Sequence, residues 1–203
     1  MIQFSYMIYP NYLLERKLLK QGYNKIVGVD EVGRGALAGP MVAAAAVISA
    51  QFKPSKYIRD SKLLSERRRE KIFEDLSEKV IWSFGLVSHK EIDRLGIARA
   101  NLLVIKRALR KLAIKPDYLL LDKVNGFKHS LPFESIVAGD RKVTSIAIAS
   151  ILAKVTRDRM MRKLHQKFPQ YYFNRHKGYG TKLHKACLKK YGACRIHRLS
   201  YKY

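Results

Sequence analysis

The alternation of apolar and polar positions predicts a chain of alternating strands and helices. Short apolar runs at residues 25–29, 41–48 and 118–121 have the length and composition of buried strands. Residues 80–87 alternate between apolar and polar side chains and predict another strand, and the brief apolar run at 136–139 predicts one more. Because helical periodicity fills the segments between them, we expect an α/β domain with a layered core.

Helical spacing of apolar residues predicts the remaining elements. Ser65 is a residue type that caps helix N-termini, so it marks the start of one of them. The longest helical segment contains a stripe of Ala and Ser, which permits close packing against a sheet. The expected helices cover 13–20, 65–79, 89–112 and 145–167, followed by a loop at 174–181 and a basic helix and tail over 184–203.

Acidic residues follow three of the strand-like segments. Asp30 and Glu31 end the first run, Asp122 ends the run at 118–121, and Asp140 ends the run at 136–139. Sites in α/β sheets form at the carboxyl ends of strands, so we expect these four acids to converge. For the first pair alone, an acidic turn that caps a strand is an equal alternative, because neighbours on a strand point to opposite faces.

Four adjacent carboxylates predict a metal site. Two ionised carboxylates about 4 Å apart repel by roughly 4 kcal/mol at an effective dielectric near 20, so cations are needed to keep the group ionised. Oxygen ligands without His or Cys favour Mg²⁺ or Mn²⁺ over Zn²⁺. Cys187 and Cys194, with His184 and His197 nearby, match no compact zinc pattern, and we expect free thiols.

The charge of the chain predicts a polyanionic partner. The sequence has 41 Lys and Arg against 16 Asp and Glu, a formal net charge of +25. Because the basic residues are spread along the chain and not gathered on one amphipathic helix, nucleic acid is a better partner than a membrane. The N-terminus has no basic region before its apolar part, so we expect no signal peptide and a cytoplasmic protein.

Several motifs, in order along the chain, resemble those of the type 2 ribonucleases H, and specifically bacterial ribonuclease HII. They lie at residues 28–48 (GVDEVGRGALAGPMVAAAAVI), 59–70 (RDSKLLSERRRE), 119–122 (LLLD), 139–159 (GDRKVTSIAIASILAKVTRDR), 176–184 (HKGYGTKLH) and 196–201 (IHRLSY). This resemblance implies a ribonuclease-H-like mixed β-sheet flanked by helices, with a small helical C-terminal part. It predicts an N-terminal helical extension over 1–24, a catalytic domain over 25–168 and a substrate-closing region over 169–203.

The resemblance also implies an activity and a role for each matching residue. A monomeric endonuclease of this family would cut the RNA strand of RNA–DNA hybrids and incise duplex DNA 5′ of embedded ribonucleotides, leaving 5′-phosphate and 3′-hydroxyl ends. The four acids would hold two Mg²⁺ or Mn²⁺ ions. The backbone of the turn formed by Gly33, Arg34 and Gly35 would meet the ribose 2′-hydroxyl. Tyr179 would stack on or bond to the same sugar, and Lys62 would contact phosphate.

Two other functions agree with parts of this pattern. A basic RNA-binding protein without catalytic chemistry would account for the net charge of +25, and it would bind in a salt-dependent way. A metal nuclease directed at DNA would account for the acids, but it would give the glycine turn and Tyr179 no role in reading a ribose. Cleavage of an all-DNA duplex separates the two nucleases.

Overall fold

The computed structural model describes residues 10–48, 52, 58 and 65–202, so Lys62 lies outside the described residues. Its elements, in chain order, are α1 (Leu13–Lys20), β1 (Ile26–Val32), β2 (Met41–Ile48), α2 (Glu66–Lys79), β3 (Trp82–Val87), α3 (His89–Leu95), α4 (Ile97–Arg110), β4 (Tyr118–Asp122), β5 (Phe133–Ile136), α5 (Gly139–Lys142), α6 (Thr144–Lys167), the 3₁₀ helix η2 (Pro169–Tyr171), α7 (Phe173–His176) and α8 (Lys182–Tyr191). The strands form one sheet in the order β3-β2-β1-β4-β5. β2 runs antiparallel to β1 and β3, whereas β1, β4 and β5 are parallel. The predicted mixed sheet is confirmed.

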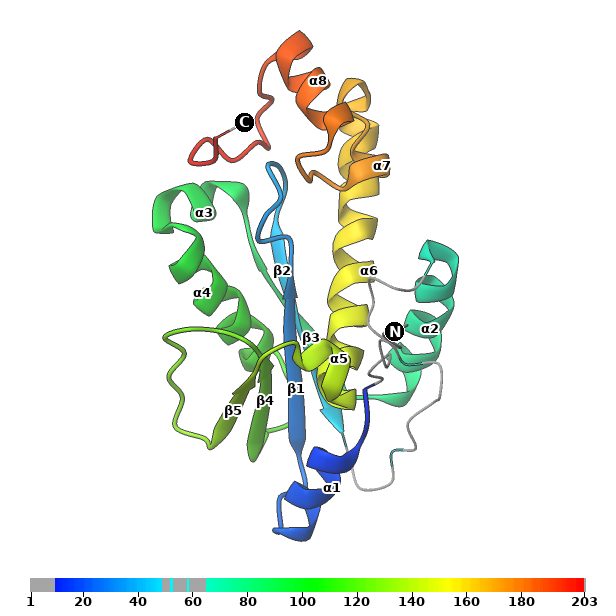
Figure 1. Cartoon of the computed structure of the whole chain (residues 1–203), viewed down its shortest axis with the longest axis vertical. Coiled ribbons are helices and arrows are strands. Elements are labelled where there is room, and N and C mark those ends of the chain that lie inside the picture. The colour runs from blue at the N-terminus through cyan, green and yellow to red at the C-terminus, as the bar shows by residue number, and fades with distance from the viewer. Residues whose placement is uncertain (1–9, 49–51, 53–57, 59–64, 203) are drawn as a thin grey trace, which may run out of the picture.

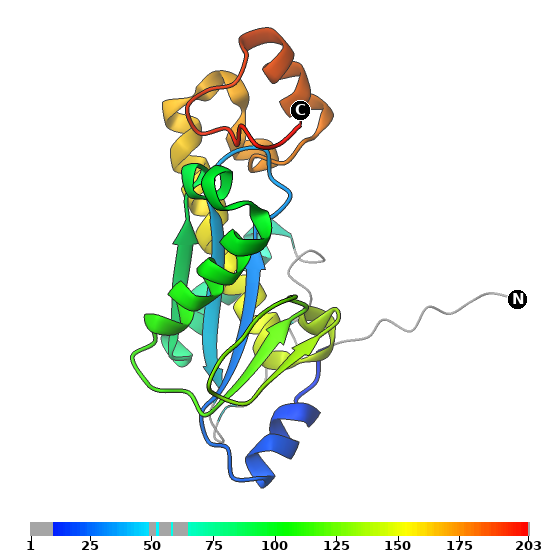
Figure 2. The same cartoon turned by 90° about the vertical axis from the view of Figure 1, so that its left-hand side faces the viewer.

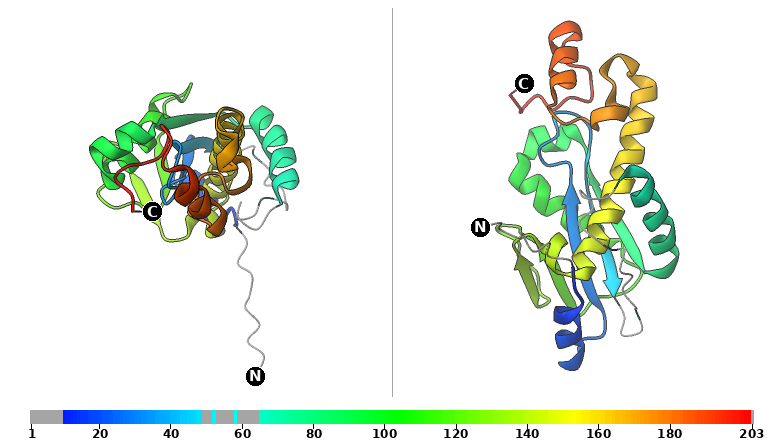
Figure 3. Two further views of the ribbon diagram at one scale, coloured as in Figure 1. Left: turned by 90° about the horizontal axis from the view of Figure 1, so that it is seen from above. Right: turned by 45° about the vertical axis from the view of Figure 1, so that its right-hand side comes forward.

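Helices cover both faces of the sheet, as Figure 1 shows from the side and Figure 3 from above. Alternate residues of β1, such as Val27 and Val29, pack with α4 on one face. The opposite face of β2, with Ala44 and Ala46, packs against α2 and α6. Because side chains alternate across a strand, successive residues of β1 point toward different helices. This alternation decides where the acids at the end of β1 point.

The packing of α6 on β1 depends on small residues. A Cβ atom on Gly28 would lie 2.1 Å from the backbone carbon of Ser145, which no side chain tolerates. The absence of a side chain at Gly28 therefore lets the start of α6 rest directly on the strand. The predicted bounds of α1 and β2 are confirmed, and those of α6 differ by one residue. Ser65 caps α2 as expected, accepting a hydrogen bond from the N–H of Arg68.

The predicted helix over 89–112 is wrong as a single element. Gly96 has a φ of 74° and separates α3 from α4. Its N–H donates to the carbonyl of Ile92 and ends α3, while its own carbonyl accepts from the N–H of Ala100 in α4. Apolar spacing continues across this break because Ile92 of α3 and Ala100 of α4 belong to the same apolar cluster, so periodicity alone hides it.

The predicted strand over 136–139 is also wrong. β5 lies earlier, at Phe133–Ile136, and Val137 is 62% exposed. Ala138 adopts the left-handed conformation with a φ of 54°, and the short helix α5 starts at the next residue. Asp140 therefore belongs to a helix that follows a sharp turn, and it does not end a strand.

The described part of the N-terminal segment is integrated with the rest of the fold. Asn11 pairs with Val143, and the buried Glu15 accepts a hydrogen bond of 2.7 Å from the N–H of Ser145. Because this N–H is one of the donors that the start of a helix leaves without a helical partner, Glu15 acts as a cap for α6 supplied by another helix. The position of α1 at one end of the molecule, seen in Figure 1, follows from these contacts.

The C-terminal helices gather at the other end of the molecule, beyond the sheet, as Figures 1 and 2 show. They have an apolar cluster of their own, in which Met161 of α6 packs with Tyr171, Phe173 and Cys187. The predicted loop at 174–181 begins as the short helix α7. Both cysteines are free, as predicted. Across the part of the chain that is described, no helix is long and apolar enough to cross a membrane.

Candidate active site

Asp30 and Glu31 lie on β1 and do not end it, which corrects the prediction. The pairing of β1 with β4 stops at Val29, whereas its pairing with β2 continues to Val32. β1 therefore extends beyond β4 by the residues that carry the two carboxyl groups.

The two side chains point to opposite faces of the strand. Asp30 is buried on the α6 side, where the hydroxyl of Ser150 hydrogen-bonds to it. Glu31 lies on the α4 side, and its Oε1 accepts from Nδ2 of Asn101 at 3.1 Å. Both nevertheless line one pocket. The absence of β4 beside this end of β1 leaves the space in which they share a site.

Asp122 and Asp140 are linked through the start of α5. Asp122 is the last residue of β4, and its Oδ1 accepts a hydrogen bond of 2.8 Å from the N–H of Gly139. Asp140 follows directly and is only 3% exposed. The sharp turn at Ala138 thus brings the fourth acid next to the third, although the predicted strand before it does not exist.

The acids converge at a pocket of about 470 Å³. It is lined by Asp30, Glu31, Val32, Arg34, Asp122, Ser150, Lys154 and Tyr179. Asp140 is not part of this lining, but its negative charge reaches the carboxyl group of Asp30. The structure therefore brings together all four predicted acids and Tyr179, which come from four separate elements or loops.

The pocket disfavours simultaneous ionisation of its acids. Burial raises the pKa of Asp30 well above its usual range, and the charges of Glu31, Asp122 and Asp140 raise it further. Burial also raises the pKa of Glu31, while Arg34 and the hydrogen bond from Asn101 oppose this effect. Among the described residues, no three Asp, Glu, His or Cys side chains are already arranged as ligands of one ion.

The donor set nevertheless fits hard divalent cations. Four carboxylates offer oxygen ligands and no sulfur, which is the chemistry that Mg²⁺ and Mn²⁺ prefer. Bound cations would also remove the repulsion that raises the pKa of Asp30. Both the oxygen donor set and the repulsion are properties of these four carboxyl groups.

The glycine turn and Tyr179 meet beside the acids. Ala36 pairs with Tyr179 in an antiparallel bridge, and the N–H of Leu37 donates to the carbonyl of Gly178 at 2.8 Å. Gly33 is buried with a φ of 95°, whereas Arg34 and Gly35 are exposed. The structure thus joins two motifs that are more than 140 residues apart in the sequence.

Sequence reasoning missed Arg157, which lies beneath both motifs. This fully buried side chain donates from Nε to the carbonyl of Pro40 at 2.8 Å, and its guanidinium carbon lies 5.2 Å from the ring centroid of Tyr179. A Cβ atom on Gly33 would lie 2.3 Å from the same Nε, so Arg157 occupies the space of a side chain there. Burial lowers the pKa of Arg157 to about 10. Its role depends on tertiary packing, which no local pattern indicates.

Lys154 and the partners of the first two acids were missed as well. Lys154 lines the pocket, and its Nζ donates to the buried Asp158 at 2.8 Å. Asn101 is a buried amide among the apolar residues of α4, and Ser150 is a buried hydroxyl in α6. A polar residue within an apolar helix face is the signal that could have pointed to Asn101.

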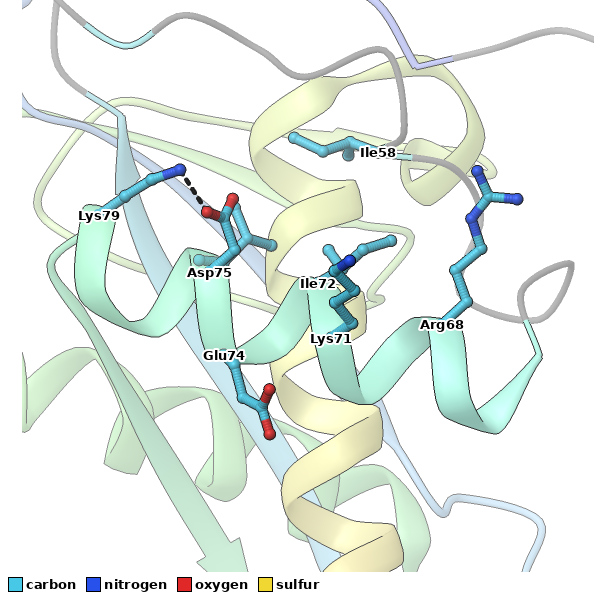
Figure 4. Close-up of a pocket in the computed structure, with 8 residues that line it drawn as sticks. Ile58, Arg68, Lys71, Ile72, Glu74, Asp75 and Lys79 are labelled. Atoms are coloured by element: carbon cyan, nitrogen blue, oxygen red, sulfur yellow. Dashed lines mark hydrogen bonds and ion pairs between the residues drawn. The ribbon is translucent and has the colours of Figure 1, made fainter.

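A larger pocket, of about 780 Å³, lies beside α2 (Figure 4). It is lined by Ile58, Arg68, Lys71, Ile72, Glu74, Asp75, Leu76 and Lys79, and Figure 4 marks the ion pair between Lys79 and Asp75. It shares no residue with the pocket of the four acids. Its size therefore does not make it the candidate active site.

Comparison with known proteins places this geometry in a family. A profile of the family described as ribonuclease HII matches residues 27–203. A curated ribonuclease HII of Caldicellulosiruptor bescii is 48% identical over 192 residues, which cover 93% of this chain and 91% of the relative. The crystal structure of the ribonuclease H2 of Pyrococcus horikoshii OT3 superposes with a TM-score of 0.73 at 30% identity, covering 88% of this chain and 94% of that one.

A more distant solved structure shares the fold. It is the crystal structure of Bst-RNase HIII in complex with Mn²⁺, with a TM-score of 0.71 at 18% identity, covering 88% of this chain and 67% of that one. The profile, the curated relative and the shared fold agree with the motifs and with the convergence of the acids. The chain therefore belongs to the ribonuclease HII family and is a ribonuclease H.

Proposed function

We propose that this enzyme hydrolyses the RNA strand of RNA–DNA hybrids and incises duplex DNA on the 5′ side of embedded ribonucleotides, leaving 5′-phosphate and 3′-hydroxyl ends. The observation that supports it most is the meeting of Asp30, Glu31 and Asp122 with Tyr179 in one pocket. The acids supply a reacting centre, and Tyr179 with the glycine turn supplies groups that can contact a sugar. The net charge of +25 attracts the phosphate backbone.

Asp30, Glu31, Asp122 and Asp140 would hold two Mg²⁺ or Mn²⁺ ions. Two such ions supply an activated water and stabilise the leaving 3′ oxygen in an in-line displacement at phosphorus. Asp122 is oriented by the N–H of Gly139, and Glu31 by Asn101. The carboxylates would rotate toward the ions, because no three of the described acidic side chains are arranged as ligands in their present positions. The Mn²⁺ complex of Bst-RNase HIII supports this choice of ion.

The backbone of Gly33, Arg34 and Gly35 would recognise the ribose 2′-hydroxyl, and Tyr179 would contact the same sugar. The 2′-hydroxyl is the group that distinguishes RNA from DNA. The bridge between Ala36 and Tyr179 supports this role, since it places the two contacts side by side. Residues 169–203 would close over the duplex, and Lys62, outside the described residues, would contact a phosphate.

Lys154 would add a positive charge within the pocket. Its Nζ lies 5.9 Å from the centroid of the Tyr179 ring and is held by Asp158. An ammonium group at this point can attract a phosphate without displacing the acids. We expect the enzyme to act as a cytoplasmic monomer.

The experiment is cleavage of a duplex that contains one ribonucleotide, with Mn²⁺ or Mg²⁺ and with EDTA. We expect one incision 5′ of the ribonucleotide that requires the divalent ion, and no cleavage of the matched all-DNA duplex. Efficient cutting of the all-DNA duplex would favour the DNA-directed nuclease and remove the role given to Tyr179. Salt-dependent binding without any cleavage would contradict the proposed reaction as a whole.

A further inference from the structure

Three buried histidines lie in the C-terminal part of the fold, outside the pocket of the acids. His176 and His184 stack with ring centroids 4.3 Å apart, and Nε2 of His184 lies 3.0 Å from Nε2 of His197. All three are less than 9% exposed. Two facing Nε2 atoms can form a hydrogen bond only if one of them carries a proton and the other does not.

The backbone around His197 decides which nitrogen carries that proton. The carbonyl of Cys194 already accepts from the N–H of His197 at 2.9 Å, and the N–H of Cys194 donates to Nδ1 of His197, also at 2.9 Å. The carbonyl oxygen of Cys194 also lies 3.2 Å from Nδ1 of His197, but a neutral ring nitrogen that accepts the N–H of Cys194 has no proton to donate to that oxygen. Nδ1 of His197 is therefore an acceptor, so the proton is on Nε2 and is donated to His184. Nε2 of His184 then accepts, and its proton is on Nδ1.

The chain of hydrogen bonds ends at Tyr179. Nδ1 of His184 lies 3.0 Å from the carbonyl oxygen of Tyr179, to which it donates. The direction of donation thus runs from His197 through His184 to Tyr179. Burial lowers the pKa of His184 and of His197, which keeps both rings neutral. A protonated His184 would place two N–H groups against each other.

His176 supports the same segment separately. The N–H of Gly178 donates to its Nδ1 at 3.2 Å, which leaves the proton on Nε2, and Nε2 donates to the carbonyl of Tyr171 at 2.7 Å. Burial lowers the pKa of His176 to about 4. His176 therefore holds Gly178, the residue before Tyr179, and His184 holds the carbonyl of Tyr179 itself.

Both ends of this chain of hydrogen bonds, Tyr179 and His197, pair with the segment that follows the glycine turn. Ala36 pairs with Tyr179, and Ala38 pairs with His197. The hydrogen bonds between His197, His184 and Tyr179 therefore close a ring of contacts around residues 36–38. Such a ring fixes the position of Tyr179 relative to the turn more firmly than the bridge to Ala36 alone.

We propose that His184 and His197 are positioning residues, which hold Tyr179 at the distance from the glycine turn that lets both contact one ribose. This inference rests on the proposed function of Tyr179. Neither histidine lines the pocket or touches the reacting groups. Their effect is on geometry, and displacement of a substrate-positioning group by about 1 Å can reduce a rate by as much as about 100-fold.

Two substitutions at His184 separate its hydrogen bonds from its packing. His184→Phe keeps a ring between His176 and Phe173 but can neither donate to Tyr179 nor accept from His197. His184→Asn loses the ring but places an amide N–H where Nδ1 stands. For the duplex with one ribonucleotide, we expect His184→Phe to lower kcat about tenfold or more, with KM changed less than about twofold. His184→Asn should retain kcat within about threefold of wild type, even though its Tm is lower.

The two variants are assayed beside wild type and Tyr179→Ala. A loss of cleavage in Tyr179→Ala with full kcat in His184→Phe would overturn the positioning role alone. Equal losses in His184→Phe and His184→Asn would also overturn it, because packing and not hydrogen bonding would then matter. Failure of the wild-type enzyme to cut 5′ of the ribonucleotide would instead contradict the proposed function.

A second measurement does not depend on activity. The ¹⁵N chemical shifts of the imidazole nitrogens, recorded on the full chain near pH 7, report which nitrogen carries a proton. We expect a proton on Nδ1 of His184 and on Nε2 of His197. The opposite tautomer at either ring would break the chain of donors and overturn the inference, whatever the substrate.

Discussion

The acid pocket and the region beside it differ in how far their buried polar side chains are stabilised by partners within the protein. The acid pocket gathers Asp30, Glu31 and Asp122, with Asp140 beside it. The neighbouring region, which we call the turn assembly, combines residues 33–40 and Tyr179 with the buried side chains of Arg157, His184, His197 and Arg198. In the turn assembly, each of these four side chains donates a hydrogen bond to a backbone carbonyl or to another ring. In the acid pocket, the carboxylates repel one another and burial raises the pKa of two of them.

This contrast indicates which part is complete in the protein alone. Arg198 illustrates the turn assembly, because its guanidinium donates to the carbonyls of Gly39 and Arg34 at about 3 Å and needs no external partner. The acid pocket has too little positive charge of its own to balance its carboxylates, because Lys154 is already paired with Asp158 and Arg34 pairs with Glu31 alone among the four acids. We therefore expect the turn assembly to be formed before substrate binds and the acid pocket to be completed by cations.

The largest expected effect comes from removing one acid. Asp122→Asn should lower cleavage of the single-ribonucleotide duplex by about 1,000-fold or more, because a cation loses a ligand whose charge acts in the reaction. Binding of the duplex in EDTA should change less than about twofold, since the basic surface is unchanged. Rates and binding constants measured in parallel test this. Near-normal cleavage by Asp122→Asn would show that the acids do not work as a group.

Removing a buried cation of the turn assembly should cost stability first. Arg157→Met leaves the carbonyls of Pro40 and Ala38 without their donor, and we expect a loss of about 3 kcal/mol in the free energy of unfolding. Arg198→Met is the matched control, because it also empties a buried guanidinium site that bonds to backbone carbonyls. Both should unfold at lower urea concentration. Arg157→Met should also reduce the preference for a ribonucleotide, and more than Arg198→Met does, since the Arg157 guanidinium lies over the Tyr179 ring and against Gly33 whereas Arg198 bonds to the turn at the carbonyl of Arg34.

Acid should weaken the fold beside the turn assembly through His176, the ring that stacks on His184. The pKa of His176 is about 4 in the folded chain, below its ordinary value of 6.5, so the unfolded chain binds protons more readily between these values. Stability from this ring is therefore present above pH 6.5 and is lost as the pH falls toward 4. The raised pKa of Asp30 acts in the opposite direction, because the folded state then takes up the proton first.

Urea unfolding at pH 7 and pH 5 isolates the histidine contribution. His176→Gln should reduce the loss of stability on acidification by about 1–3 kcal/mol relative to wild type, even if it is less stable at pH 7. The groups that face this ring are His184, Lys177 and His165. His129→Gln is the control for the substitution itself, because His129 is exposed. If His176→Gln lost as much stability between pH 7 and pH 5 as wild type does, the ring of His176 would already be charged in the folded state.

The smallest expected effect is an increase in stability, whereas a substitution at a buried site usually decreases it. Asp30→Asn should stabilise the protein by about 1 kcal/mol in EDTA, because it removes a buried charge near three other carboxylates. Mn²⁺ should raise the Tm of wild type and raise that of Asp30→Asn much less. Thermal unfolding with and without the ion measures both. Destabilisation of Asp30→Asn in EDTA would show that the protein alone already satisfies this carboxylate.

Elements with a clear local pattern could be predicted from the sequence. The bounds of α1 and β2 were predicted to the residue, since an amphipathic stretch and a continuous apolar run each identify one structure. The break at Gly96 and the turn at Ala138 were not, because both positions lie within apolar patterns that continue past them. The extension of β1 through Asp30 and Glu31 depends on its pairing with β2, which is not visible in the strand itself.

The motifs of the sequence predicted that the four acids, the glycine turn and Tyr179 form one site. The chemistry of these residues depends on residue type, so it can be predicted from the sequence without coordinates. Only the tertiary structure showed what holds them in place: Arg157 bonds to Ala38 across 119 positions of the chain, and His197 reaches Tyr179 through His184. Contacts of this kind form between segments that meet only after folding. A sequence records the partners but not their proximity, and proximity decides which buried polar groups are satisfied.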